Sequence, residues 1–556
     1  MTVGIDLGTT NSLIGIVDDG RVLLVPNRRG HVLTPSVIGI DMNGEVIVGE
    51  AARNQAVSAP GRTLHHIKRH MGERLTLPLG DEMISPEEGS AAILRVLRQD
   101  VARYTGGAAP ESAVITVPAH FDDRQRNATV EAGLLAGFRH VRLLNEPTAA
   151  ALPYAARDVQ RERILVFDFG GGTLDVTCLE REGDEFHVAA TVGDGNLGGV
   201  DIDGIVLDRL AREVEAQTGL DVTKDPTMEQ MLRNMAETAK TELSDLEETT
   251  IAIPFVAGSG GMVHISVVLT RAELEDAIAP VVNRAMGITD EALRDAGLKQ
   301  DGFDTLVLAG GSSRLPVMRR ALAERFPVAI ASMINPEEIV AVGATQLADS
   351  RRNGRFSLHD VVSGTLALEL ADGTCIPIVH RNQTIPARRT RVFTTVADDQ
   401  VEAEIHLLQG DRPRAAENRS LGKFLLSGLE EAERGSPRIA VTVEVNADGV
   451  VTVHAGDEKT GSSREMVARA RPRELKQPIR GDFQDWLRSL ARRGKILLDH
   501  APAGLAAEVS ELVALAESST GSAEQEYAIT VLETLLLEIT ARAMIRGDTG
   551  GARAER

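Results

Sequence analysis

The spacing of hydrophobic residues divides the chain into three parts with different periods. Up to about residue 350, short apolar runs alternate with stretches in which apolar residues recur every three or four positions. Such alternation is typical of buried strands followed by helices, as in an α/β fold. In the clearest helix candidate, Asp203–Glu215, the apolar residues fall on one face. The strand candidates are Val3–Ile5, Ala113–Val117, Ile164–Asp168 and Thr305–Leu308.

The second part has a period of two. From about Gly364 to Ala470, apolar and polar residues alternate, most clearly over Val401–Leu407 and Ile439–Val445. A turn at Asn446–Gly449 then leads into another apolar run. Because alternation without helix-length stretches is typical of antiparallel hairpins, this part is predicted to be a β-sandwich.

The third part, from about Gly481 to Met544, is helical again. Trp486 and Leu490 lie on the apolar face of one candidate helix, and Leu532 and Ile539 lie on that of another. The changes of period place the α/β part at 1–352, a linker at 353–365, the sandwich at 366–472 and the helices at 473–546. The charged, glycine-containing tail at 547–556 is expected to be disordered.

Composition and charge narrow the class of protein. A length of 556 residues with 43% hydrophobic and 25% charged residues predicts two or three globular domains. The net charge of −21 argues against a general nucleic-acid binder, because phosphate would be repelled. The basic residues between Arg469 and Lys495 are interpreted as a solvated helix face and linker.

Cysteine usage and hydropathy indicate a compartment. Cys178 and Cys375 are far apart and form no CxxC pattern, so neither a disulfide framework nor a zinc site is expected. No signal peptide begins the sequence, and no apolar run reaches the roughly 18 residues that span a bilayer. The expectation is a cytoplasmic protein that binds no membrane.

Three glycine-rich turns directly follow predicted strands. They span Asp6–Asn11, Asp168–Asp175 and Leu308–Arg314. Glycine lets several backbone N–H groups face one anion, and the carboxylates of Asp6 and Asp168 could hold a hard cation beside it. One such turn alone could be an ordinary hairpin or Asx turn. Together they predict a site for a metal and a polyphosphate between two lobes.

Two other patterns offer alternative sites. Gly193–Gly198 matches GxGxxG, which would suggest a dinucleotide fold if it opened its own domain, but it lies in mid-chain. No GxxxxGK[ST] pattern occurs, which excludes a P-loop NTPase. His65, His66 and His70 suggest zinc, but the sequence offers no third ligand for the pair spaced i, i+4.

Longer motifs carry a family resemblance. In the first 350 residues they are IDLGTTNS (5–12), VITVPAHFDDRQRNAT (114–129), LLNEPTAAAL (143–152), VFDFGGGTLDVT (166–177), VLAGGSSRLP (307–316) and INPEEIVAVGA (334–344). Later come LLQGDRPRAAENRSLGKFLLSGL (407–429) and the hairpin Val441–Ala455. Together they resemble the 70-kDa heat-shock family of DnaK-type chaperones over residues 2–470. The resemblance implies an α/β actin-like (ribonuclease H-like) two-lobed ATPase, then an antiparallel β-sandwich and a short C-terminal helical lid.

The resemblance also implies a nucleotide site for ATP or ADP with Mg²⁺ and K⁺. The matched catalytic residues are Lys68, Glu146, Asp168 and Thr173, and the matched metal carboxylates are Asp6, Asp168 and Asp175. The matched nucleotide contacts are Gly8, Thr9, Thr10, Asn11, Gly170, Gly171, Gly172, Thr173, Gly198, Glu237, Lys240, Ser244, Gly310, Gly311, Ser312, Arg314 and Glu337. Taken singly, Lys68 could be a solvated lysine and Glu146 an ion-pair partner.

In the predicted sandwich, the resemblance implies a pocket for an apolar side chain of an extended peptide. It would be formed by Leu368, Phe393, Ala403, Ile405 and Val450, which could equally be plain sandwich core. In the ATPase part, Pro118 and Arg126 match the residues that relay the nucleotide state to the linker.

Several positions depart from the family pattern. The linker stretch Leu358–Thr365 is less apolar than usual and lacks the proline, which puts coupling between the domains in doubt. Ala371 and Ala403 replace bulkier residues, so a wider or weaker peptide pocket is expected. The helical lid is short. These features suggest a specialised branch near the HscC-type bacterial members.

The implied function is that of an ATP-dependent molecular chaperone, a slow ATPase that binds and releases exposed hydrophobic segments in protein folding and the stress response. Its implied partners are unfolded peptides, a J-domain cochaperone and a nucleotide exchange factor, and a monomer is expected. An actin-like filament protein is an alternative that leaves residues 366–470 unexplained. A sugar or acetate kinase is a second alternative. Such an enzyme needs a general base for its small hydroxyl substrate, and the sequence offers no candidate beside the glycine-rich turns.

Overall fold

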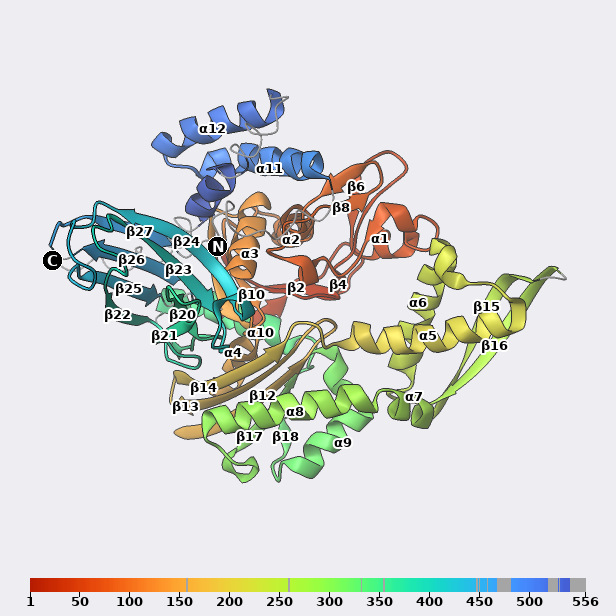
Figure 1. Cartoon of the computed structure of the whole chain (residues 1–556). Helices are drawn as coiled ribbons and strands as arrows, with labels where there is room; N and C mark the ends of the chain where they lie inside the picture. Colours follow the sequence, from red (N-terminus) through yellow and green to blue (C-terminus); the bar gives the residue numbers. More distant parts are fainter. Residues whose placement is uncertain are drawn as a thin grey trace.

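The computed structural model describes residues 1–156, 159–258, 261–331, 333–353, 356–446, 449, 451–457, 459–467, 482–518, 529 and 531–540. Along the chain it contains two α/β lobes, a β-sandwich and a group of C-terminal helices, coloured from red to blue in Figure 1. Val450, the basic residues at 469–476 and the predicted tail at 547–556 lie outside the described residues.

The first lobe is built on a sheet of order β11-β10-β1-β2-β3, with β4 beside β2. Its strands β1, β10 and β11 are parallel, and β2 and β3 continue the sheet antiparallel. Helix α10 returns from the end of the second lobe and packs so closely that a Cβ on Gly4 would overlap the backbone of Thr345. The elements of this lobe are β1 (Thr2–Leu7), β2 (Asn11–Asp18), β3 (Arg21–Leu24), β4 (Thr34–Pro35), β5 (Ile38–Ile40), β6 (Val46–Val48), α1 (Glu50–Gln55), β7 (Thr63–Leu64), β8 (Leu77–Leu79), β9 (Glu82–Ile84), α2 (Pro86–Thr105), β10 (Ser112–Val117), α3 (Asp123–Leu135), β11 (His140–Asn145), α4 (Glu146–Ala151) and α10 (Ile339–Asn353).

The second lobe repeats this plan with a sheet of order β18-β17-β12-β13-β14-β19. A hairpin, β15–β16, extends from this lobe beyond α5 and α6 (Figure 1). Strand β14 is antiparallel to β13, so the GxGxxG sequence at its end does not follow the first strand of a parallel βαβ unit. The elements are β12 (Arg161–Phe169), β13 (Leu174–Glu182), β14 (Glu185–Asp194), α5 (Gly199–Thr218), α6 (Pro226–Glu242), β15 (Glu248–Gly258), β16 (Gly261–Thr270), α7 (Arg271–Ala277), α8 (Ala279–Ala296), β17 (Thr305–Ala309), α9 (Pro316–Arg325), β18 (Ile330–Ala331) and β19 (Ser357–His359).

The predicted sandwich is present as two four-stranded antiparallel sheets, β21-β20-β23-β24 and β22-β25-β26-β27. The alternation read from the sequence is confirmed in β25, where Val441, Val443 and Val445 are at most 2% exposed and face the other sheet's core residues. The strands are β20 (Leu366–Glu369), β21 (Cys375–Val379), β22 (Ala387–Phe393), β23 (Glu402–Gln409), β24 (Arg419–Ser427), β25 (Ile439–Val445), β26 (Val451–Asp457) and β27 (Ser463–Val467).

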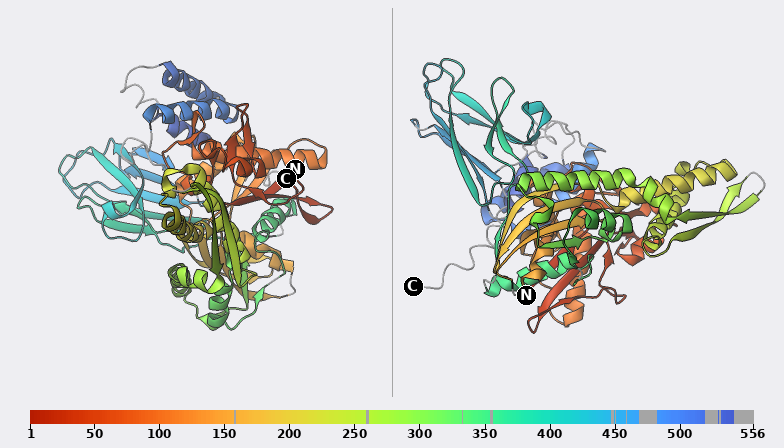
Figure 2. Two further views of the ribbon diagram at one scale, coloured as in Figure 1. Left: turned by 90° about the vertical axis from the view of Figure 1, so that its right-hand side faces the viewer. Right: turned by 90° about the horizontal axis from the view of Figure 1, so that it is seen from below.

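The C-terminal helices pack on the first lobe. They comprise α11 (Phe483–Leu497), α12 (Ala503–Ser518) and a helical stretch at 531–540, and in Figures 1 and 2 they lie over the first lobe's helices α2 and α3. Their apolar residues, Trp486 and Leu490 among them, belong to the same buried cluster as the strands and helices of that lobe. None of the helices in the described part of the chain is both long and apolar enough to cross a membrane.

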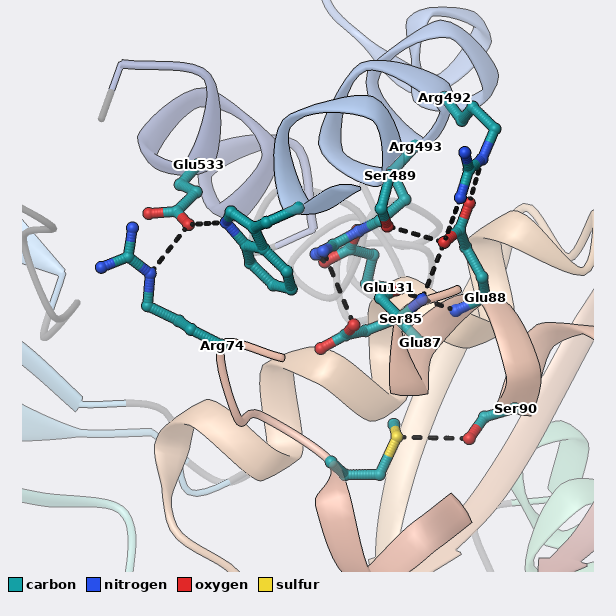
Figure 3. Close-up of polar contacts among 12 residues, drawn as sticks. Arg74, Ser85, Glu87, Glu88, Ser90, Glu131, Ser489, Arg492, Arg493 and Glu533 are labelled. Atoms are coloured by element: carbon teal, nitrogen blue, oxygen red, sulfur yellow. Dashed lines mark hydrogen bonds and ion pairs between the residues drawn. The ribbon is translucent and has the colours of Figure 1, made fainter. Parts of the chain in front are cut away.

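An ion-pair cluster joins these helices to α2 and α3 (Figure 3). The side chain of Arg493 is 7% exposed and forms two hydrogen bonds to the carboxylate of Glu131, at 2.6 and 2.8 Å. Beside it, Arg492 and Ser489 contact Glu88. The interpretation of this basic stretch as a solvated helix face is therefore wrong for Arg493, because the sequence did not reveal the carboxylates that face it.

The predicted linker is ordered where it is described. Its residues 357–359 form β19, which extends the second sheet by pairing in parallel with β14. The next residue, Asp360, is partly buried and accepts a hydrogen bond of 2.5 Å from Asn145 of the first lobe. The linker thus contacts both lobes before it enters the sandwich.

Candidate nucleotide site

A cleft of about 260 Å³ lies between the two lobes, where all three predicted glycine-rich turns meet. The turns come together because each follows a strand that ends at this edge: β1, β12 and β17. Every residue predicted from the sequence for the nucleotide and its metal lines this cleft, except Gly198 and Asp175. Residues that were grouped from separate sequence motifs therefore lie together in space.

The glycines are required because the turns of the two lobes nearly touch. A Cβ on Gly172 would lie 2.5 Å from Oγ1 of Thr9, and one on Gly171 would overlap the hydroxyl of Thr10. Gly198 lies outside the cleft, but it packs against Gly171 from behind, where a Cβ would overlap the carbonyl. Larger residues at these positions would push the lobes apart and open the cleft.

One ammonium stands among several buried carboxylates at the bottom of the cleft. Nζ of Lys68 lies 2.5 Å from Oε1 of Glu146, and both side chains are less than 10% exposed. Burial, together with the charge of Glu146, raises the pKa of Asp6 to about 7, although Lys68 and a hydrogen bond from Thr116 oppose the shift. Burial and the neighbouring carboxylates also raise the pKa of Asp168 well above its usual range.

These raised pKa values provide a test of whether a cation fits the site. Asp6 and Asp168 are each the last residue but one of their strands, β1 and β12, so carboxylates from both lobes converge on one place. Their negative charge exceeds what Lys68 can neutralise, and carboxylate oxygens are the ligands that Mg²⁺ prefers. The donor set therefore fits a magnesium ion beside phosphates.

Asp175 lies beside the cleft, where it meets a histidine that the sequence analysis did not single out. The Nδ1 atom of His120 is 3.0 Å from Oδ1 of Asp175. Burial alone would lower the pKa of His120, but the charge and hydrogen bond of Asp175 outweigh it and raise the pKa. The position of His120, three residues after the end of β10 at the same edge as the turns, was the signal that could have identified it.

The side of the cleft formed by α6 carries the residues matched to the nucleoside. Glu237 and Lys240 lie within α6, whereas Ser244 lies just beyond its end and donates a hydrogen bond to the carbonyl of Lys240. The ammonium of Lys240 is held 2.7 Å from Asp203 of α5. The sequence analysis did not identify Asp203 as a residue of the site. Burial raises the pKa of Asp203 to about 6, although the charge of Lys240 opposes the shift.

The third turn closes the opposite side. The hydroxyl of Ser312 donates a hydrogen bond of 2.8 Å to the carbonyl of Gly170, which joins the second and third turns. Arg314 pairs with Glu337 at 3.2 Å, and both side chains are partly exposed to the cleft. Gly310 has a φ of 76°, a conformation that favours glycine, and a Cβ there would overlap the backbone of Phe169.

Two histidines line the cleft without offering a metal site. Burial lowers the pKa of His65 to about 4 and that of His66 to about 3, so both rings are neutral near pH 7. Among the described residues, no group of three metal-ligating side chains includes them or His70.

The residues matched to a peptide pocket lie together in the sandwich. Leu368 and Ile405 are buried in its core, while Phe393 and Ala403 are partly buried against that core. Val450 lies outside the described residues. This placement is what both a peptide pocket and plain sandwich core require, so the two interpretations remain open.

The predicted relay residues lie between the cleft and the linker. Arg126 of α3 is buried, and its Nη2 donates a hydrogen bond of 2.7 Å to the side chain of Asn145. Asn145 in turn donates to Asp360, which links α3 to the linker through two side-chain hydrogen bonds. Pro118 follows β10 and accepts a hydrogen bond from Phe121. Asn145 and Asp360 were not singled out, because their pairing spans 215 residues of sequence.

Two comparisons with known proteins cover most of the chain. The model of the family described as "Hsp70 protein" matches residues 2–79 and 75–480. A protein named "Chaperone protein DnaK" from Thermotoga neapolitana is 41% identical over 493 residues, which cover 87% of this chain and 83% of that protein. The similarity thus extends across both lobes and the sandwich.

Proposed function

The chain belongs to the Hsp70 family, and from this premise we propose which of its residues carry out the family's ATP-driven cycle. The chain is an ATP-dependent molecular chaperone whose ATPase uses nucleotide with Mg²⁺. Neither the filament protein nor the small-molecule kinase finds support in these similarities.

We propose that Lys68 stabilises the charge that develops on the transferred phosphoryl group and orients the attacking water. Its ammonium is buried and held by Glu146, so it is positioned before the nucleotide arrives. Glu146 accepts from that ammonium and stands beside the water, and the hydroxyl of Thr173 donates to the terminal phosphate. Bound Mg²⁺ supplies charge neutralisation for the phosphates, with Asp6 and Asp168 to hold it.

For the rest of the nucleotide, we propose that the backbone N–H groups of the three turns bind the phosphates, with Asp175 beside a potassium ion. Glu237, Lys240 and Ser244 would contact the nucleoside from one lobe side, with Arg314 opposite. The lining of the cleft supports this division, because the three turns contribute its glycines and the carboxylates Asp6 and Asp168, whereas α6 contributes a separate group that includes Glu237 and Lys240.

The proposal also assigns a role to each part of the chain. Residues 1–352 would form the ATPase, 353–365 the linker, 366–472 the peptide-binding sandwich and 473–546 the lid. Extended apolar peptides would bind at Leu368, Phe393, Ala403 and Ile405, and a J-domain cochaperone and an exchange factor would act on the ATPase. A monomeric state and a cytoplasmic location stay predictions.

The buried Lys68–Glu146 pair among surplus carboxylates is the observation that carries this proposal. It is tested by steady-state ATP turnover of the full chain with and without an extended apolar heptapeptide. Turnover that depends on Mg²⁺ and rises severalfold with the peptide is expected. The absence of nucleotide affinity in the presence of Mg²⁺ would contradict it, as would stimulation by a small sugar in place of the peptide.

A further inference from the structure

The linker strand brings a histidine beside a histidine and a glutamate of the second sheet. The parallel register of β19 and β14 places His359 opposite His187, and Ser357 opposite Glu185. Residues two apart on a strand share a face, so these four polar side chains form a square on one face of the sheet edge. No nucleotide-site residue is among them.

The other face of the same strand pair is apolar. Phe186 is 1% exposed, and Leu358, its register partner, packs against the same buried cluster. A slip of one residue would turn this apolar pair to solvent, so the register that brings the histidines together is fixed by the core. The polar square is therefore a consequence of linker pairing and exists only while β19 is paired.

Three of the four side chains offer metal ligands at short range. One ligand atom each from Glu185, His187 and His359 lie within 4.8 Å of one another. The two imidazole rings are stacked with centroids 4.4 Å apart and an interplanar angle of 2°. Nε2 of His187 is also 3.4 Å from a carboxylate oxygen of Glu185. In the part of the chain that the structure describes, these residues are the one group of three or more His, Cys, Asp or Glu side chains close enough to hold a metal ion.

The donor types and the freedom of the side chains fit a borderline transition metal. Two imidazoles and a carboxylate suit Zn²⁺, whereas Mg²⁺ and Ca²⁺ prefer oxygen donors alone. Ligands bound at about 2.0–2.1 Å in a tetrahedron lie roughly 3.3 Å apart, so the donors need to approach one another by at most about 1.5 Å. The side chains of His187 and Glu185 are 45% and 59% exposed and can rotate that far. Glu182, across from Glu185 on β13, adds negative charge.

We propose that Glu185, His187 and His359 form a zinc-binding site that fastens the linker strand to the second lobe. Two ligands come from β14 and one from β19, so the complete set exists only when the linker is paired. A ligand that binds one state more tightly shifts the population toward it. Zinc therefore stabilises the paired linker, and none of its three ligands lines the nucleotide cleft.

The test uses the full chain stripped of metal, with excess Mg²⁺ and ADP present so that the nucleotide cleft does not compete for zinc. Zinc affinity is measured against a chromophoric chelator, and Co²⁺ is used as a spectroscopic probe of tetrahedral coordination. One tight equivalent is expected in the parent protein. His359→Leu and His187→Asn each remove one of three ligands, and each should weaken zinc binding at least tenfold and abolish the intense Co²⁺ band.

The matched control is His140→Ala, which removes an exposed histidine of β11, a strand of the first lobe's sheet and not of the sheet that holds this site. It should bind zinc as the parent does. Hydrogen exchange supplies the second readout: saturating zinc should slow exchange of the amides at 358–360 at least tenfold in the parent and in the control, but not in His359→Leu.

Two results would overturn the proposal. One is zinc binding that is equally tight in His359→Leu and His187→Asn, which would mean adventitious surface histidines only. The other is tight zinc binding that leaves linker exchange unchanged. Should the linker variant fail to fold, His187→Asn, which leaves β19 intact, decides between these outcomes.

Discussion

Lys68 lies on a short 3₁₀ turn, Ile67–His70, where it is buried against Glu146 instead of extending into solvent. We predict that Lys68→Met lowers the single-turnover rate of ATP hydrolysis by about 100-fold or more, because it removes a positioned charge from the site of phosphoryl transfer. Affinity for Mg-ADP should change less than the rate, since the hydrogen bond of the ammonium goes to Glu146 and not to the turns or α6. Rapid-quench measurement of a preformed ATP complex checks the rate.

Loss of the lysine also leaves Glu146 buried without its partner, so destabilisation must be separated from catalysis. The double variant Lys68→Met with Glu146→Gln removes both charges and should recover thermal stability without recovering hydrolysis. An ordinary single-turnover rate in the folded single variant would show that the site has been wrongly assigned.

Asp123, the first residue of α3, is another buried carboxylate whose pKa is strongly shifted by its surroundings. It faces the sandwich, where the backbone N–H of Val451 donates to it, and burial raises its pKa to about 7 against the opposing effects of Arg126 and that hydrogen bond. A carboxyl whose pKa is raised on docking favours the docked state most at low pH. This contribution is fully present below about pH 4 and is lost as the pH rises to about 7.

We therefore predict that the sandwich undocks from the first lobe more readily at pH 8 than at pH 5.5. The population ratio should change by up to about tenfold per pH unit within that window. Asp123→Asn should flatten this dependence and favour docking at pH 8, whereas Asp301→Asn, at an exposed position of the second lobe, should leave it unchanged. Small-angle X-ray scattering at the two pH values measures the change, and an unaltered pH profile in Asp123→Asn would contradict the prediction.

Among the elements, α11 shows most clearly that a charged residue can hold a helix in place when it is buried against carboxylates. Arg493 neutralises Glu131 and also lies 3.5 Å from Glu87, and these carboxylates raise its pKa further even though burial opposes this. We predict that Arg493→Met weakens packing of the C-terminal helices on the first lobe by about 3–5 kcal/mol, because two buried carboxylates lose their partner. The fluorescence of Trp486, the single tryptophan, reports this as a red shift.

Two variants show whether the ion pairs, and not the helix itself, are responsible. Arg488→Met removes a more exposed arginine of the same helix, whose partner Asp485 is also in α11, and should change the emission little. Adding Glu87→Gln and Glu131→Gln to Arg493→Met should restore much of the packing. Emission from Arg493→Met that matches the parent protein would mean that the apolar contacts suffice.

Element types were predictable because their periodicity is local. Ile439–Val445 was predicted as an alternating strand and is β25, and Trp486 and Leu490 do lie on the buried face of α11. The partner of that face was not predictable, since an apolar stripe packs equally well on a sandwich or on a lobe. The three turns could be assigned to one cleft because each follows a strand, whereas His120 and Asn145 act through partners distant in sequence.

At the scale of the whole molecule, the sandwich is joined to both lobes by polar contacts beside the linker. Arg381 lies in the loop that connects β21 of one sandwich sheet to β22 of the other. Its side chain contacts Glu291 and Asp295 of α8 in the second lobe. On the other side, Arg419 pairs with Asp122 of the first lobe. The arginines of these contacts are partly exposed, so each contact is modest by itself and is screened by salt.

Charge reversal at Arg381 tests whether such contacts determine the arrangement of the domains. Arg381→Glu places a like charge against Glu291 and Asp295, so the sandwich should separate from the second lobe and the radius of gyration should rise. Adding Glu291→Arg offers a new partner of opposite sign and should reverse part of the change. Arg388→Glu, whose nearest carboxylate Glu444 lies within the sandwich itself, is the matched control and should leave the radius unchanged. If Arg381→Glu scatters like the parent protein at low salt, the linker and the apolar contacts hold the sandwich in place without these ion pairs.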